Sequence, residues 1–82
     1  MDLKAIRDQL SLARAVLGRE HPQSPRIEKV ERQLTPGDAF FRDDAVSAEK
    51  DLLAISADLE QLPGSAPVNE AIKHLADAIE LL

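Results

Sequence analysis

Residues 41–62 decide the fold, and they read FRDDAVSAEKDLLAISADLEQL. Their apolar positions recur at alternating steps of four and three residues, at Phe41, Ala45, Ala48, Leu52, Ile55, Leu59 and Leu62. This spacing is a heptad repeat, which places one narrow apolar stripe along a helix that packs against other helices. The stretch therefore predicts a long helix within a helical bundle.

Three further segments carry apolar stripes at helical spacing. Their members are Leu3, Ile6, Leu10, Ala13 and Leu17 in residues 3–17, Ile27, Val30 and Leu34 in residues 25–34, and Val68, Ile72, Leu75, Ile79 and Leu82 in residues 67–82. The spacing predicts one helix over each segment. The sequence thus predicts four helices, of which the one over residues 25–34 is short.

Proline and glycine residues separate the predicted helices. Gly18 is a plausible stop for the first helix, and Pro22 lies in a turn because proline cannot continue a helix. We expect Ser24 to cap the short helix, with Pro25 at its first position. The long helix can begin anywhere from Pro36 to Asp43. The predicted fold is all-α, a single domain over residues 1–82 forming an antiparallel four-helix, up-down-up-down bundle of three long helices and one short helix.

The composition limits the class of protein. The chain has no cysteine, no tryptophan and no tyrosine, so it has no disulfide and no thiolate, and aliphatic side chains build its core. It has no apolar run of about 18 residues, the length needed to span a membrane. The first residues are charged and amphipathic, which is not typical of a signal peptide. We expect a soluble, cytoplasmic protein with no membrane partner.

Charge is distributed unevenly along the chain. Residues 1–34 carry seven Lys and Arg against five Asp and Glu, a net charge of +2, whereas residues 35–82 carry three against ten, a net charge of −7. A basic first part can complement an acidic second part, either within one bundle or between copies. The acidic surface disfavours nucleic acid as a partner, because phosphates would be repelled.

Sequence motifs for catalysis are weak. Ser47 and Lys50 form a Ser-x-x-Lys pattern, but no further motif supports them, and a coincidence is favoured. His74 suggests histidine phosphotransfer, yet the bulky Leu75 follows it, so an exposed surface histidine is favoured. No metal-ligand spacing is present. We therefore expect no enzyme activity, no catalytic residue, no metal and no cofactor.

A column of acidic side chains follows the predicted long helix. Asp44, Asp51 and Asp58 are each seven residues apart, and Arg7 and Arg14 are spaced likewise on the first helix. Acidic and basic columns of this kind can set the register between parallel helices, within the chain or across a dimer. The simpler interpretation is that these charges are solvated flanking residues. Both interpretations stay open from the sequence.

Several apolar residues lie off the predicted stripes, including Phe40, Val46 and Leu53. The short helix cannot cover the whole length of its neighbours, so a second chain is the simplest cover for the remaining apolar surface. We predict a non-enzymatic protein–protein interaction module (a small acidic adaptor, chaperone-like subunit or assembly factor) that self-associates as a homodimer or binds another protein. Its predicted contact residues are Phe40, Phe41, Asp44, Val46, Asp51, Leu53 and Asp58. The alternative is an acidic inhibitor or immunity-type protein that occupies a basic surface of a nuclease or DNA-binding target.

Overall fold

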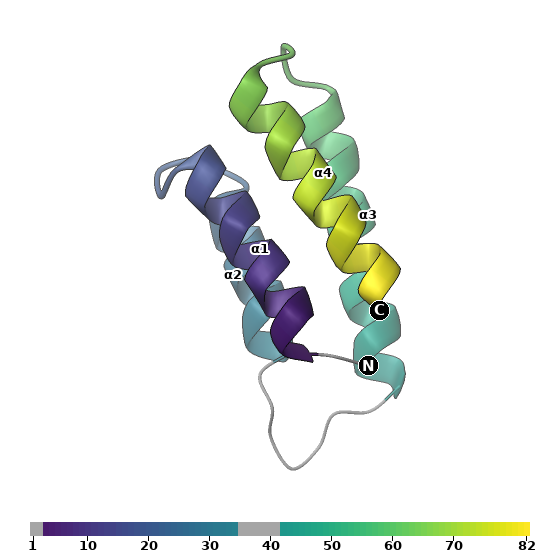
Figure 1. Cartoon of the computed structure of the whole chain (residues 1–82). Coiled ribbons are helices and arrows are strands. Elements are labelled where there is room, and N and C mark those ends of the chain that lie inside the picture. Colours follow the sequence, from purple (N-terminus) through teal and green to yellow (C-terminus); the bar gives the residue numbers. More distant parts are fainter. Residues whose placement is uncertain (1–2, 35–41) are drawn as a thin grey trace.

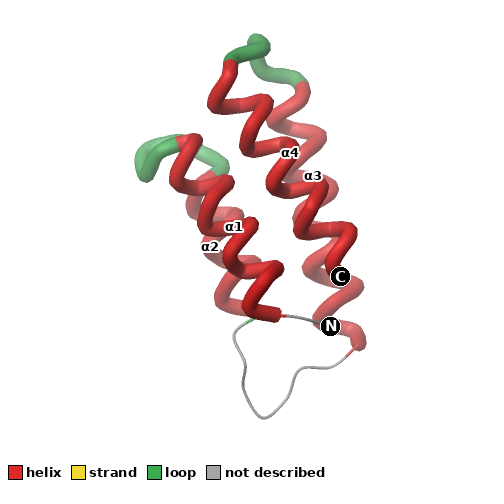
Figure 2. Tube along the Cα trace, viewed as in Figure 1, coloured by secondary structure: helices red, strands yellow, loops and turns green. Residues whose placement is uncertain are grey.

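The structure is a computed structural model that describes residues 3–34 and 42–82, with side chains described from residue 45 onward in the second range. It contains four helices, which are α1 (Leu3–Leu17), α2 (Ser24–Gln33), α3 (Arg42–Glu60) and α4 (Ala66–Leu81). No strand occurs in these two ranges, as Figure 2 shows. The predicted all-α fold is confirmed, and α3 begins within the predicted window from Pro36 to Asp43.

The helices form an up-down-up-down bundle in which sequence neighbours are also neighbours in space (Figure 1). α1 and α4 share the most extensive contact and close the bundle. α1 and α3 lie on one diagonal and α2 and α4 on the other, and neither diagonal pair makes a close backbone contact in the described residues. The bundle measures 39 × 19 × 18 Å, so it is elongated along the helices.

The α3–α4 hairpin extends beyond the α1–α2 hairpin at one end of the bundle (Figure 1). α2 spans 10 residues and α3 spans 19, and the α3–α4 turn projects beyond the α1–α2 turn in Figure 1. Leu62, predicted as the last residue of the long stripe, lies past the end of α3 and is 39% exposed. That part of the prediction is wrong, because Pro63 follows and disfavours helical geometry at the residue before it.

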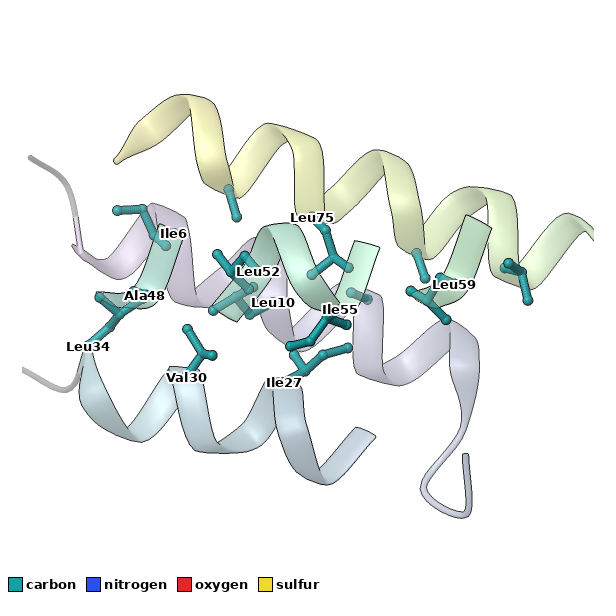
Figure 3. Close-up of a cluster of buried hydrophobic side chains, with 14 residues drawn as sticks. Ile6, Leu10, Ile27, Val30, Leu34, Ala48, Leu52, Ile55, Leu59 and Leu75 are labelled. Carbon is teal, nitrogen blue, oxygen red and sulfur yellow. The ribbon is translucent and has the colours of Figure 1, made fainter. Parts of the chain in front are cut away.

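One apolar core joins all four helices (Figure 3). The predicted stripes of α1 and α3 are confirmed over their central turns. The buried members are Ile6, Leu10 and Ala13 on α1, Ile27 and Val30 on α2 with Leu34 just beyond it, and Ala48, Leu52, Ile55 and Leu59 on α3. Burying these aliphatic side chains supplies the main favourable free energy of folding.

The stripe of α4 differs from the prediction. The buried residues are Val68, Ala71, Leu75 and Ala78, whereas Ile72 and Ile79, which the sequence placed at the centre of the stripe, are only partly buried. Alanine occupies little space, so it lets two helix backbones approach closely. The alanine side of α4 therefore faces the core, in which α1, the helix that α4 contacts most, also buries Ala13.

The turn between α1 and α2 is fixed by Gly18 and Ser24. Gly18 has φ +92°, a left-handed conformation that ends α1, and its N–H donates to the carbonyl of Arg14 at 2.9 Å. Ser24 is not the N-cap that the sequence suggested; it is the first residue of α2 and is buried. Its hydroxyl donates to the Gly18 carbonyl at 2.7 Å, and the same carbonyl accepts from the N–H of His21 at 3.2 Å.

We expect Gly18→Ala to lower the free energy of unfolding by about 1 kcal/mol, because a Cβ disfavours the left-handed conformation. A Cβ at Gly18 would meet no atom within 4 Å, so the loss would come from the backbone alone. Urea unfolding followed by far-UV circular dichroism measures it. Gly64→Ala is the matched control, since Gly64 has equal space and no positive φ, and it should be neutral or slightly stabilising. Equal losses at the two glycines would contradict the prediction.

Candidate functional site

The outward surface of α3 exposes two large aliphatic side chains. Val46 is 50% exposed and Leu53 is 51% exposed. They are seven residues apart, so they lie on one face of the helix about 10.5 Å from each other. The exposed Glu49 and Lys50 lie between them. We call these four residues the α3 face. Two of the predicted contact residues, Val46 and Leu53, therefore lie together at the surface.

Three of the predicted contact residues have side chains outside the part of the chain that the structure describes. Phe40 and Phe41 lie outside the described residues, and Asp44 lies in the first turn of α3, where side chains are not described. Their proposed role in binding stays a prediction.

The two described members of the acidic column, Asp51 and Asp58, lie beside α2. Asp58 accepts a charge-assisted hydrogen bond from Arg26 at 2.5 Å, and Asp51 lines a small hollow of about 110 Å³ together with Arg26 and Lys29. Both partners of the Asp58 pair are about half exposed, so the pair contributes little to stability. Asp51 and Asp58 therefore lie beside basic residues of α2, the antiparallel neighbour of α3.

In the described residues, no ion pair joins Arg7 or Arg14 of α1 to Asp51 or Asp58 of α3, so these residues do not form the predicted ladder within the chain. These two helices lie on a diagonal of the bundle, and Arg14 pairs with Glu31 of α2 instead, at 2.7 Å. The prediction assumed that parallel helices would be neighbours. In this bundle, however, each helix lies beside the helices that precede and follow it in the sequence. The parallel helices α1 and α3 therefore lie across the core from each other.

A groove between α1 and α2 is lined by charged side chains. Two adjoining hollows, of about 410 and 360 Å³, share Ser11, Arg14 and Glu28 among their lining residues. No lining residue comes from α3 or α4, so the groove opens away from the core. We call it the arginine groove and define it by its main charged residues, Arg7, Arg14, Arg19, Glu28, Glu31 and Arg32.

Hydrogen bonds organise part of the arginine groove. Glu31 is only 12% exposed at its side chain and accepts from both Arg14 and the hydroxyl of Ser11, the latter at 3.1 Å. Arg32 pairs with Glu28 one turn away on α2, at 2.9 Å. The Nε atoms of Arg7 and Arg14 are buried and have no hydrogen-bond partner. The groove thus contains hydrogen-bond donors that its own carboxylates do not pair with.

The sequence interpretation missed this groove. A signal was present, because Arg7 and Arg14 are spaced by one heptad on α1 and Glu28 and Glu31 share one side of α2. The prediction matched Arg7 and Arg14 to the acidic residues of α3, however, and not to those of α2. The pairing of adjacent helices is what brings the two sets of charges together.

The residues considered for catalysis lie apart from one another. His74 is half-buried, and its Nδ1 lies 2.9 Å from Oε1 of Gln9, so the imidazole N–H donates to an amide oxygen across the α1–α4 contact. The expectation of an exposed histidine is therefore wrong, since α1 covers one side of it. Ser47 and Lys50 are both exposed on α3, and neither lines the hollows described above.

In residues 3–34 and 42–82, no group of three or more His, Cys, Asp or Glu side chains is placed to hold a metal ion. No helix in the same ranges combines the length and apolar character needed to cross a membrane. No protein-family model matches the chain, and no curated protein or solved structure matches it significantly.

Proposed function

We propose that this chain is a non-enzymatic protein–protein interaction module, a small adaptor or assembly factor, that associates through the α3 face with a second copy of itself or with another protein. The observation that carries the proposal is the half exposure of Val46 and Leu53 on one side of α3. The neighbouring stripe of the same helix is fully buried at Ala48, Leu52 and Leu59. Aliphatic side chains grouped at a surface are typical of interaction sites.

The order of residues on the α3 face supports pairing with a second copy. In an antiparallel pair of α3 helices with a twofold axis between Glu49 and Lys50, each residue meets the one at the mirrored position. Val46 of one copy then meets Leu53 of the other, and Glu49 meets Lys50. An apolar pair and an ion pair form twice, as an isologous interface requires. The proposed contact is therefore self-complementary in both shape and charge.

The energy available from this contact is modest. Covering the exposed half of a valine or leucine side chain contributes on the order of 1 kcal/mol. Four such side chains meet in the proposed pair, and part of their gain offsets the entropy lost on association. We therefore expect a weak, concentration-dependent dimer. A partner protein that adds contacts around the same face would bind more tightly.

The alternative of an acidic inhibitor has less support. Asp58 already pairs with Arg26 of the same chain, and Asp51 lies beside Arg26 and Lys29. These carboxylates are thus partly neutralised before any basic target approaches. An inhibitor of that kind would bind more weakly at high salt and would lose binding on Asp51→Lys, whereas apolar contact through the α3 face tolerates salt.

Sedimentation equilibrium tests the proposal over a range of concentrations, at low and high salt. We expect the mean mass to rise above the 9.0 kDa of the monomer and to stay raised in high salt, because the contact is mainly apolar. Leu53→Ala should return the mass to that of the monomer. Leu12→Ala is the matched control, since Leu12 is also exposed (46%) but lies on α1, and it should leave the mass unchanged. A mass of 9.0 kDa at every concentration would contradict self-association.

A further inference from the structure

The arginine groove follows the α1–α2 hairpin on a surface separate from the α3 face. Its lining runs from Arg7 and Arg32 at one end to Gly18 and Arg19 at the other. From Arg7 to Leu17, a separation of ten residue steps, α1 extends about 15 Å. The site is thus a trough with a cation at each end.

The cations of the groove exceed what its carboxylates can pair. Glu28 and Glu31 are held by Arg32 and Arg14. In the described part of the chain, Arg7 and Arg19 have no ion-pair partner. The Nε of Arg7 is also buried without a hydrogen-bond acceptor, and a buried donor left unpaired is costly. The charges of Arg7 and Arg19 are therefore not offset by a paired carboxylate in the described residues.

We propose that the arginine groove binds an acidic peptide segment of a partner protein, in extended conformation, with carboxylates at its two ends. Guanidinium groups match carboxylates in both charge and planar geometry. An extended chain rises about 3.3 Å per residue, so acidic residues about five positions apart reach both Arg7 and Arg19. The polar hydroxyl of Ser11 and the central guanidinium of Arg14 line the floor between them.

The internal carboxylates distinguish this ligand from other anions. Asp8, Glu28 and Glu31 line the groove between its cations, so a strand of nucleic acid, with a charge at every nucleotide, would meet repulsion along its length. A single small anion would engage only one end. An acidic peptide can instead place uncharged residues beside Glu28 and Glu31 and keep its carboxylates for the two ends.

Titration of the ¹⁵N-labelled protein with the acetylated and amidated hexapeptide Glu-Ser-Ser-Ser-Ser-Glu, which carries a carboxylate only at each end, tests this proposal by NMR at low salt. The shift changes are expected to concentrate on amides of residues 7–19 and 28–32. Arg7→Gln and Arg19→Gln should each weaken binding by roughly twofold to fivefold. Arg26→Gln is the matched control, because it removes the same charge from α2 but pairs with Asp58 on another side. Its binding should stay close to that of the parent protein.

Four outcomes would overturn the proposal. They are shift changes spread evenly over the surface, a loss for Arg26→Gln equal to that for Arg7→Gln, binding of hexathymidylate as tight as that of the hexapeptide, and binding of inorganic phosphate as tight as that of the hexapeptide. The ¹⁵N spectrum of each variant also reports whether it is folded. The result is independent of the α3 face, because Leu53→Ala should leave binding of the hexapeptide unchanged.

Discussion

Leu52→Ala is expected to lower the free energy of unfolding by roughly 2–5 kcal/mol. Leu52 is fully buried in the middle of α3 and belongs to one cluster with Leu10 of α1 and Leu75 of α4 (Figure 3). Truncation removes favourable burial and leaves a cavity that neighbouring helices fill only in part. Urea unfolding followed by far-UV circular dichroism measures the change, since the chain has no tryptophan or tyrosine to report by fluorescence.

The size of this loss matters because the domain is small. A chain of 82 residues has a total stability of roughly 4–12 kcal/mol. Leu52→Ala can therefore unfold it outright. Ile55→Val, a smaller truncation at another buried position of α3, should cost roughly 0.5–1.5 kcal/mol and remain measurable. The two variants together keep the prediction testable.

Leu53→Ala is the control at the adjacent position. Leu53 is 51% exposed, so its truncation leaves no buried cavity and should cost well under 1 kcal/mol. The same variant is expected to abolish self-association. The two variants therefore distinguish the role of Leu52 in the core from the role of Leu53 in association. A loss of stability at Leu53 equal to that at Leu52 would contradict both the assigned core and the assigned α3 face.

The helices could be predicted well because local signals define them. Proline and glycine mark the turns, and the heptad spacing of α1 and α3 identifies their buried sides. Gly18 ends α1 where the sequence placed the end. Such features depend on the chain nearby, so one sequence is enough to predict them.

The choice of buried face on α4 could not be predicted in this way. Ala71 and Ile72 are adjacent, and so are Ala78 and Ile79, so two stripes fit the same spacing. Hydrophobicity alone favours the isoleucines. The bundle buries the alanines, because the contact with α1 is the most extensive of the four and small side chains permit it.

The two candidate surfaces, the α3 face and the arginine groove, also differ in how far the sequence could predict them. The exposure of Val46 and Leu53 follows from the stripe of their own helix, so the sequence could indicate it. The arginine groove depends on which helix lies beside α1. The prediction paired α1 with α3, its parallel relative, whereas the closed order of the bundle places α2 and α4 beside it. Packing of the whole domain decides which helices become neighbours, and a local sequence pattern does not contain that information.

Ala71→Leu is expected to lower the free energy of unfolding by roughly 1–3 kcal/mol, although leucine is the more hydrophobic residue and an equally good helix former. Ala71 is fully buried, and the hydrogen bond between Gln9 and His74 fixes the register of α4 against α1 close by. Three added carbon atoms would have to separate the two helices. Urea unfolding by circular dichroism measures the effect.

Ala76→Leu on the same helix is the matched control. Ala76 is exposed, so a leucine there adds the same atoms and the same helix propensity without meeting α1. Its free energy of unfolding should stay within about 0.5 kcal/mol of the parent protein. If Ala71→Leu were equally mild, the α1–α4 contact would have room for a larger side chain, and close approach would no longer explain why alanine and not isoleucine faces the core. A loss confined to Ala71 would instead show that helix separation, more than hydrophobicity, selects the buried side of α4.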